Sequence, residues 1–427
     1  MLTLDKKKYS KNGIIALCSI VYFVSYFSRK DFAAVMAGMI FDNAISHTNA
    51  GLVGAMLFIF YGIGQLLSGY LGDKIKPKFL ILIGLSTTAL CNALMPIVPE
   101  VAMIFIWGLN GLAQAMLWPP IVKILSTYLD HKSYVTANLL VTSAAHTATI
   151  LLYLYVPICL SFMSWQSVFY TASALALVSS LIFITAMGFV LPKEAQVDTA
   201  VRVTVTEDST SSEKQDNLLT VLRKSGIFTI FVCIIVVGFL RDGIESWLPM
   251  LYAEAFGKSA SESTLVSVIL PIFSILSIMV VTALYRKGLF ENEVSGSLIL
   301  FSLSLVFAIP LAFFVGMDGA FFRISALFLT ATICAAMHGA NFLLISCLPG
   351  RFARIGRSAT VSGVCNSCVY IGAAVSTYGI ALISEHMGWS VTIATWCGVV
   401  AVGILFALLS RKRYVAMINN AEDNSAK

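Results

Sequence analysis

The sequence predicts an all-α polytopic membrane protein. Of its 427 residues, 58% are hydrophobic and 12% are charged, whereas soluble domains average about 25% charged residues. The apolar residues gather in segments long enough to cross a bilayer, which takes about 20 residues per helix. This composition excludes a water-soluble enzyme and a disordered chain.

Twelve such segments are predicted along the chain. Six precede a long polar stretch, Lys193 to Lys224, and six follow it. We therefore expect an N-terminal six-helix bundle over residues 1–192, a cytoplasmic linker over 193–225 and a C-terminal six-helix bundle over 226–427. The predicted spans are 13–39, 50–72, 79–98, 101–125, 134–160, 165–192, 226–256, 263–286, 295–316, 320–347, 356–384 and 388–411.

The positive charges predict the orientation of the chain. Most of the 28 Lys and Arg residues lie at the N-terminus, after even-numbered spans, in the polar linker or at the C-terminus. Cytoplasmic segments collect Lys and Arg, so we expect the linker, Lys6, Lys7, Lys8 and both termini in the cytoplasm. The net charge of +6 is then a topology signal in an inner (cytoplasmic) membrane protein, and we expect no nucleic-acid partner.

Motifs for enzymatic or ATP-driven chemistry are missing from the sequence. There is no GxxxxGK[ST] phosphate loop and no nucleophile–base or metal-ligand pattern. Cys365 and Cys368 are spaced i, i+3, but no second pair completes a metal site. The first apolar segment is too long for a cleavable signal peptide. We expect a protein that is not an enzyme and that has no cofactor and no metal.

The two halves carry a related pattern. Phe27-Ser28-Arg29 in the first span and Phe239-Leu240-Arg241 in the seventh place an arginine at about the same depth. Two parallel six-helix halves, related by an axis along the membrane normal, describe the major facilitator fold.

The connection after the second span supports that fold. It begins Gly69-Tyr70-Leu71-Gly72-Asp73-Lys74 and ends in a lysine at position 78. This order resembles the G-x-L-[GAS]-[DN]-[RK]-x-x-x-[RK] signature that major facilitators carry in the same loop. We expect Gly69, Asp73 and Lys74 to belong to a gate, in which the carboxylate caps or pairs with a neighbouring helix end.

Arg29 is the centre of the first candidate site. A charge at mid-membrane costs about 2.5–3.5 kcal/mol on insertion scales and usually faces a cavity or a partner. Tyr22, Tyr26 and Arg29 lie at i, i+4 and i+7 and share a helix face, where two hydroxyls and a guanidinium suit an oxyanion. Lys30 and Asp31 are rotated about 100° and 200° from Arg29, so we expect them to pair with other helices.

Arg241 is the centre of the second candidate site. Glu245 lies four residues on and Asp242 is adjacent, so we expect Glu245 to pair with Arg241. A salt-bridged, purely structural arginine is the alternative. Two arginines at matched depth favour a shared midplane site for a doubly charged anion, because a planar guanidinium binds carboxylate or phosphate bidentately. His146 and His338 are candidates for donating a hydrogen bond or carrying a proton there.

Motifs in both halves resemble the organophosphate:phosphate antiporter family, which includes bacterial glycerol-3-phosphate and hexose-phosphate transporters. Tyr22-x-x-x-Tyr26-x-x-Arg29-Lys30-Asp31-Phe32 resembles the family's Y-x-x-x-Y-x-x-R-K-N-F in span one. Similar matches occur in spans four, five and seven: Asn110-Gly111-Leu112-Ala113-Gln114 with Trp118-Pro119-Pro120, Ala145-His146, and Leu240-Arg241-x-Gly243-Ile244-x-x-Trp247-x-Pro249.

The resemblance implies a function and a site. In the family, inorganic phosphate on one side exchanges for a phosphorylated metabolite on the other as the two halves rock. By resemblance Arg29 and Arg241 would hold the phosphate with His146, Tyr22 and Tyr26 assisting. Trp118 would line the pathway or support packing. We expect a monomer in the lipid bilayer with a small anionic substrate. The candidate substrate-binding residues are Arg29, Arg241, His146, Tyr22, Tyr26, Lys30, Trp118, His338 and Glu245.

The sequence also departs from the family pattern. Gln65 stands where relatives often have a lysine, Asp31 replaces an asparagine, and His338 stands where a tyrosine is common. Because Asp242 and Glu245 add acids, a monoanionic substrate or proton coupling through either acid stays open. Two further functions stay open: cation-coupled uptake of another organic anion such as a sugar acid, and a membrane sensor that binds its ligand without transport.

Overall fold

The structure is a computed structural model that describes residues 10–190, 227–355 and 358–423. Within these ranges every element of regular secondary structure is a helix, and twelve helices are long and apolar enough to cross a membrane. The twelve predicted spans and the all-α class are confirmed. Lys6, Lys7, Lys8 and the linker at 193–225 lie outside the described residues, so their predicted cytoplasmic location stays a prediction.

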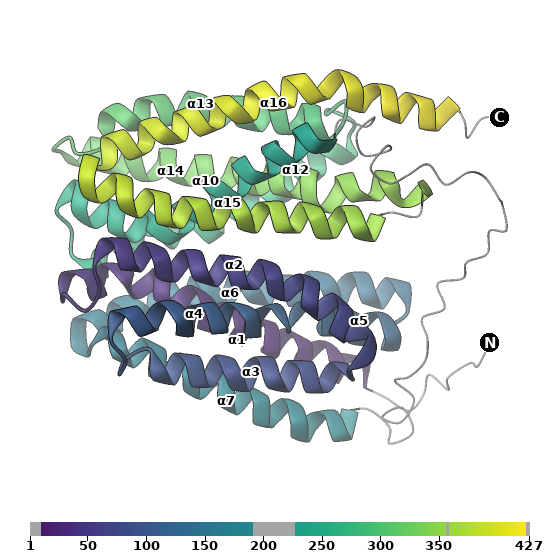
Figure 1. Cartoon of the computed structure of the whole chain (residues 1–427), viewed down its shortest axis with the longest axis horizontal. Coiled ribbons are helices and arrows are strands. Elements are labelled where there is room, and N and C mark those ends of the chain that lie inside the picture. The colour runs from purple at the N-terminus through teal and green to yellow at the C-terminus, as the bar shows by residue number, and fades with distance from the viewer. Residues whose placement is uncertain (1–9, 191–226, 356–357, 424–427) are drawn as a thin grey trace.

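The helices form two six-span halves that lie one above the other in Figure 1. The N-terminal half contains α1 (Lys11–Phe41), α2 (His47–Lys74), α3 (Pro77–Leu94), α4 (Glu100–Ala115), α5 (Trp118–Tyr128), α6 (His131–Phe162) and α7 (Trp165–Val190). The C-terminal half contains α10 (Ile227–Phe256), α11 (Ala260–Val266), α12 (Ile269–Arg286), α13 (Glu293–Phe314), α14 (Ala320–Asn341), η1 (Phe342–Cys347), η2 (Leu348–Ile355), α15 (Ser358–Met387) and α16 (Trp389–Asp423).

Three spans are interrupted, which the apolar pattern did not predict. The fourth span breaks between α4 and α5, and Trp118, Pro119 and Pro120 open the new helix. Proline has no backbone N–H to donate, so it is tolerated in a first turn and disrupts a helix interior. The eighth span breaks between α11 and α12, and the tenth ends in the π-helical and 3₁₀ turns η1 and η2.

Polar side chains cap helices at their ends. The Asp130 carboxylate accepts the backbone N–H of Ser133 at 3.3 Å at the start of α6, and it binds the Lys11 ammonium at 2.5 Å. The hydrogen bond from Lys11, helped by Ser133, holds the pKa of Asp130 well below its usual range. This contact ties the first turn of α6 to the first turn of α1.

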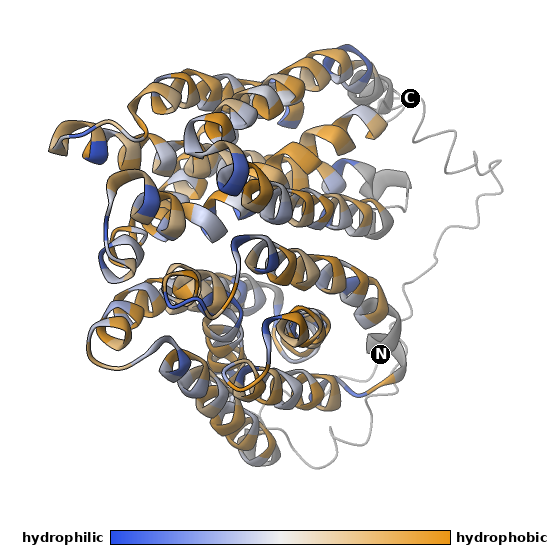
Figure 2. Ribbon diagram, turned by 60° about the vertical axis from the view of Figure 1, so that its left-hand side comes forward, coloured by the Kyte–Doolittle hydropathy of each residue, from blue (hydrophilic) through white to orange (hydrophobic). Residues whose placement is uncertain are grey.

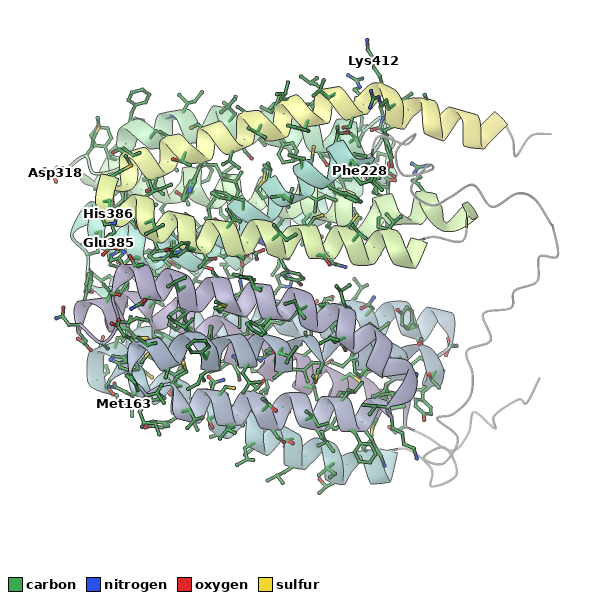
Figure 3. The ribbon with its side chains drawn as sticks, viewed as in Figure 1. Met163, Phe228, Asp318, Glu385, His386 and Lys412 are labelled. Atoms are coloured by element: carbon green, nitrogen blue, oxygen red, sulfur yellow. The ribbon has the colours of Figure 1, made fainter. Side chains whose placement is uncertain are left out.

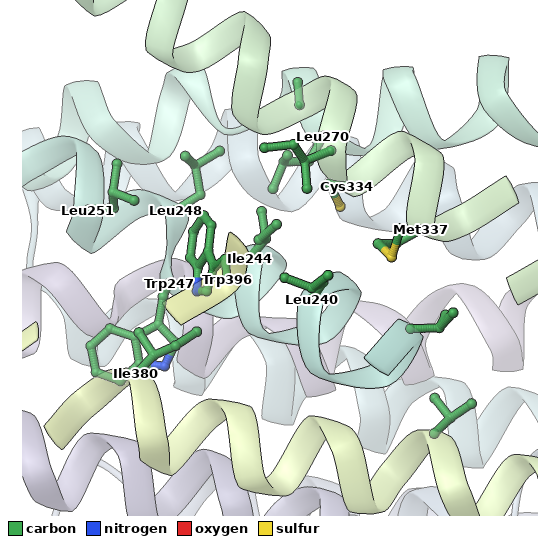
Figure 4. Packing of buried hydrophobic residues seen from close by; sticks show 14 of the residues in the cluster. Leu240, Ile244, Trp247, Leu248, Leu251, Leu270, Cys334, Met337, Ile380 and Trp396 are labelled. Atoms are coloured by element: carbon green, nitrogen blue, oxygen red, sulfur yellow. The ribbon is translucent and has the colours of Figure 1, made fainter. Parts of the chain in front are cut away.

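Each half has a packed interior and an apolar exterior. In the C-terminal half, Leu240 and Trp247 of α10 pack with Trp396 of α16 and neighbouring apolar side chains (Figure 4). A Cβ at Gly238 would overlap the Val369 carbonyl oxygen, so glycine lets α10 and α15 approach at backbone distance, as small residues do in membrane helices. Apolar residues also cover the outside of the helices, while hydrophilic segments lie mainly at turns and helix ends (Figure 2).

Hydrogen bonds between the halves gather toward one end of the bundle. His47 Nε2 lies 2.9 Å from Glu254 Oε1, and Thr48 donates to Glu385 at 2.6 Å. Figure 3 shows Glu385 at the end opposite Lys412, which lies near the C-terminal end of the chain. The halves are therefore joined on the side away from the described termini.

Candidate functional site

A cavity of about 400 Å³ lies between the two halves. Its walls come from α1, α2, α4, α5 and α6 on one side and from α10, α12, α14, η1 and α15 on the other. The structure brings the nine predicted substrate-binding residues together around this one cavity: Tyr22, Tyr26, Arg29, Lys30, Trp118, His146, Arg241, Glu245 and His338. Their substrate-binding role stays a prediction.

Arg29 is held by aromatic rings instead of by a carboxylate. Its guanidinium carbon lies 4.3 Å from the centroid of the Tyr26 ring and 5.0 Å from that of Tyr61. These are cation–π distances. Among the described residues Arg29 has no ion pair and no hydrogen bond. Its N–H groups are therefore uncommitted in the cavity, while the rings keep its plane in position.

Lys30 also lines the cavity, beside Arg29. It pairs with Glu245 of α10, so the predicted pairing with another helix is confirmed. Glu245 Oε1 also lies 2.6 Å from His338 Nε2 of α14. These side chains are only 13–16% exposed. Glu245 thus connects α1 of one half with α14 of the other.

The expected pairing of Glu245 with Arg241 is wrong. Arg241 Nη2 instead donates to the Asp242 carboxylate at 2.7 Å, and Nη1 donates to the Asn341 side-chain oxygen at 2.7 Å. The i, i+4 spacing of Arg241 and Glu245 predicts a pair only when α10 is taken as an isolated helix. In the folded protein Glu245 has cationic and histidine partners on α1 and α14, and Arg241 has a nearer carboxylate.

The remaining predicted residues form the N-terminal wall. The ring centroid of Tyr22 lies 5.1 Å from that of Tyr26 and 4.7 Å from that of Trp118. His146 Nδ1 is 2.9 Å from the Thr142 carbonyl oxygen. Because a carbonyl only accepts, Nδ1 carries the proton, and Nε2 of a neutral His146 is then an acceptor.

The charged groups of the cavity nearly cancel. Arg29, Lys30 and Arg241 are cations, and Asp242 and Glu245 are carboxylates. With neutral histidines, one positive charge is left over, and the contacts assign it to Arg29. Polar and apolar residues share the walls, which is typical of small-molecule sites.

Several lining residues were not singled out from the sequence. Tyr61 and Tyr370 surround Arg29, with ring centroids 4.7 Å apart, and Asn341 holds Arg241. Asn341 lies three residues after His338 on one helix face, a spacing that could have identified it. The tyrosines carry no comparable signal, because a lone tyrosine in an apolar span is usually a packing residue.

Asp31 and the predicted gate residues are not among the described residues that form the cavity wall. Asp31 is buried away from the cavity lining and makes no ion pair among the described residues, so the expectation that it pairs with another helix is wrong. Gly69, Asp73 and Lys74 belong to the last turns of α2, and their side chains lie outside the described part of the chain.

One group in the described residues has the composition of a metal site. Ligand atoms of Glu245, Cys334 and His338 lie within 4.8 Å of one another. Both Glu245 oxygens are already engaged, one by Lys30 and the other by His338. A metal ion would have to displace both contacts and bind beside an ammonium group, which disfavours this chemistry.

Comparisons with known proteins agree with this architecture. The model of the Major Facilitator Superfamily matches residues 18–377. A probable hexose phosphate transport protein of Chlamydia trachomatis serovar D is 21% identical over 405 residues, covering 90% of this chain and 87% of that protein. Membrane sensor protein UhpC of Escherichia coli strain K12 is 21% identical over 258 residues, covering 58% of this chain and 59% of that protein.

A solved structure shares the fold. The crystal structure of the nucleoside transporter NupG superposes with a TM-score of 0.70 at 15% identity, covering 94% of this chain and 99% of that one. The superfamily model spans most of the sequence, and the twelve helices have the expected arrangement. The chain therefore belongs to the Major Facilitator Superfamily and falls among membrane transporters, not enzymes.

Proposed function

We propose that this protein is a secondary transporter that moves a small anionic organic phosphate, such as a sugar phosphate or glycerol phosphate, in exchange for inorganic phosphate. The observation that carries the proposal is the uncommitted guanidinium of Arg29, facing a cavity whose other cations are already paired. A planar guanidinium binds two phosphate oxygens at once. Relatives named as hexose phosphate transport proteins support the substrate class.

We expect Arg29 to bind a phosphate without a change in the position of its guanidinium. The Tyr26 and Tyr61 rings keep the Arg29 plane in place, so little side-chain freedom is lost when an oxyanion binds. Arg241 faces the same cavity from the other half, oriented by Asp242 and Asn341. A phosphate that reaches both guanidinium groups would draw the halves together.

The position of the contacts that join the halves supports a mechanism of alternating access. The hydrogen bonds of His47 and Thr48 to the C-terminal half close the side away from the described termini. We propose that the cavity is reached from the other side in this state, which the positive charges assign to the cytoplasm. Rocking would break these contacts and expose Arg29 and Arg241 to the outside. We propose that a monomer in the inner membrane is the working unit.

The test is counterflow in proteoliposomes. Vesicles loaded with inorganic phosphate should take up external labelled phosphate and a sugar phosphate, while unloaded vesicles should not. Arg29→Lys should weaken phosphate binding about 10- to 100-fold, because a hydrogen bond to a charged group contributes about 1.5–3 kcal/mol. Arg286→Lys, on an exposed side chain at the end of α12, is the matched control and should behave as wild type.

Two other functions have distinct outcomes in the same assay. A sensor, as one relative is named, would bind phosphate or a sugar phosphate without any counterflow. A cation-coupled carrier of an organic anion such as a sugar acid would accumulate it in vesicles that hold no phosphate. The single unbalanced positive charge of the cavity favours this second candidate for a monoanion. Either outcome would replace phosphate exchange as the function.

A further inference from the structure

A carboxyl group outside the substrate cavity has a buried oxygen with no partner. Asp31 on α1 is 0% exposed. Its Oδ1 accepts the backbone N–H of Phe32 at 2.8 Å, and its Oδ2 has neither a hydrogen bond nor an ion pair among the described residues. A bare carboxylate oxygen in an apolar interior is costly, so a buried carboxyl takes up a proton or gains a cation.

Two other helices bring polar side chains to the same turn of α1. Asn92 of α3 and Asn110 of α4 both donate to the carbonyl oxygen of Ser28, at 3.3 and 3.2 Å. In an α-helix the carbonyl oxygen of Ser28 also accepts the backbone N–H of Phe32. The same N–H donates to Asp31 Oδ1. The shared contacts therefore place Asp31, Asn92 and Asn110 around one turn of α1.

Several oxygens of these side chains have no hydrogen-bond partner among the described residues. The amide oxygens of Asn92 and Asn110 and the hydroxyl of Thr88 are buried without hydrogen-bond partners, like Asp31 Oδ2. Asn92 Nδ2 donates to the backbone carbonyls of Ser28 and Thr88, and Asn110 Nδ2 donates to that of Ser28. Carboxylate and amide oxygens are ligands for hard cations, and an amide oxygen also accepts the O–H of a protonated carboxyl.

No charged side chain in the described part of the chain pairs with this carboxyl. Helices α3 and α4 bring the neutral side chains of Asn92 and Asn110 to the adjoining turn. Charged and titratable groups of other helices packed on α1 are engaged elsewhere: His146, Arg241, Asp242 and Glu245 at the cavity, His47 with Glu254 at the closed end, Glu262 with Lys258, and Tyr155 with Thr171. A proton or a metal cation taken up from solution would remove the cost of this buried charge.

We propose that Asp31, with Asn92 and Asn110, is the binding site for a small coupling cation, either a proton or Na⁺. Proton binding converts the carboxylate to a carboxylic acid whose O–H donates to an orphan amide oxygen, and Na⁺ binding uses the same oxygens as ligands. Phe32 and Trp107, with ring centroids 5.6 Å apart, line the cavity beside this site. Lys30, the residue before Asp31, bridges the halves through Glu245, so the cation site adjoins both the substrate cavity and the interface that opens.

The inference rests on the proposed transport function, so the assay separates the two. Wild-type phosphate counterflow at equal pH and equal Na⁺ tests transport alone; its absence contradicts the proposed function. Uptake is then measured with an inward proton gradient in Na⁺-free buffer, and with an inward Na⁺ gradient at equal pH. Stimulation by one gradient identifies the cation. Counterflow that responds to neither gradient would overturn the coupling site.

Variants test whether stimulation of uptake by the cation gradient depends on Asp31. In Asp31→Asn the ratio of uptake with the gradient to uptake without it should fall to one. Asp42→Asn, on an exposed residue just after α1, should keep the wild-type ratio. A ratio in Asp31→Asn equal to that of wild type would overturn the assignment.

Chemical labelling gives a second readout that needs no transport by the variant. A hydrophobic carbodiimide reacts with protonated buried carboxyl groups, and mass spectrometry locates the adduct. Wild-type protein should be labelled at Asp31, and labelling should fall at alkaline pH or on adding Na⁺. Asp31 that is unlabelled at every pH, or labelled without regard to pH and Na⁺, would contradict cation exchange there.

Discussion

Removing the Glu245 charge should tighten the binding of an anion. In the empty cavity the Glu245 carboxylate binds Lys30 and His338, so an incoming oxyanion has to compete with it for Lys30. Glu245→Gln keeps the size of the side chain and removes the competing charge. Lys30 then becomes a second uncommitted cation beside Arg29.

The size of the effect follows from the contact that is released. A hydrogen bond to a charged group contributes about 1.5–3 kcal/mol, and about 1.4 kcal/mol corresponds to a tenfold change in affinity. Because these side chains are only 13–16% exposed, solvent screens the interaction little. We expect phosphate to bind about 10- to 100-fold more tightly to Glu245→Gln than to the wild-type protein.

The assay is equilibrium binding of inorganic phosphate to purified protein, with counterflow measured on the same preparations. Glu262→Gln changes a carboxylate that is 58% exposed and serves as the control with unchanged affinity. Because Glu245 also joins the halves, tighter binding should come with slower counterflow. Unchanged or weaker phosphate affinity in Glu245→Gln would refute the competition between Glu245 and the anion for Lys30. Loss of uptake at both about pH 5.5 and about pH 7.5, values on either side of the usual histidine pKa, would also contradict it.

Three further predictions concern the rest of the chain. His47→Phe should keep the stacking on Trp247 but lose the contact with Glu254, so the distance between spin labels on the outer loops of the two halves should lengthen; an unchanged distance contradicts this gate. Glu293→Gln should lower the free energy of unfolding by about 1.5–3 kcal/mol, because the buried carboxylate accepts from Arg351 and two tyrosines, and an unchanged thermal midpoint would contradict this. Asp130→Asn should keep the helix cap but lower the thermal midpoint slightly through the lost Lys11 pair. The pKa of Asp130 is lowered in the folded protein, so its ion pair contributes to stability above about pH 4 and this contribution is lost as the pH falls further. The difference in thermal midpoint between wild type and Asp130→Asn should therefore shrink in acid. A difference that persists in acid excludes the ion pair as its cause.

The sequence was sufficient for the spans and for most of the charged side chains of the cavity. Apolar length identified all twelve spans, because a membrane helix must be long and apolar wherever it lies in the fold. Arg29 and Arg241 were identifiable because a charge in an apolar span needs a cavity or a partner. The breaks before Trp118 and after Val266 were missed, since both halves of each broken span remain apolar.

Pairings between helices were the part that sequence could not supply. The helical wheel gave Glu245 only Arg241 as a partner, because it contains a single helix, whereas Lys30 and His338 approach from α1 and α14. The same limit hid the role of Tyr61 at Arg29. Each contact depends on the angle and register between helices that are distant in the chain.

Lys30 shows how the missing pairing changes the expected mechanism. A rotation of about 100° from Arg29 predicted that Lys30 would pair with another helix, and the structure shows that it also lines the cavity together with Arg29. Lys30 therefore serves two interactions that exclude each other, the bridge to Glu245 and a contact with an anion. If substrate takes Lys30, the bridge between the halves opens at the moment of binding.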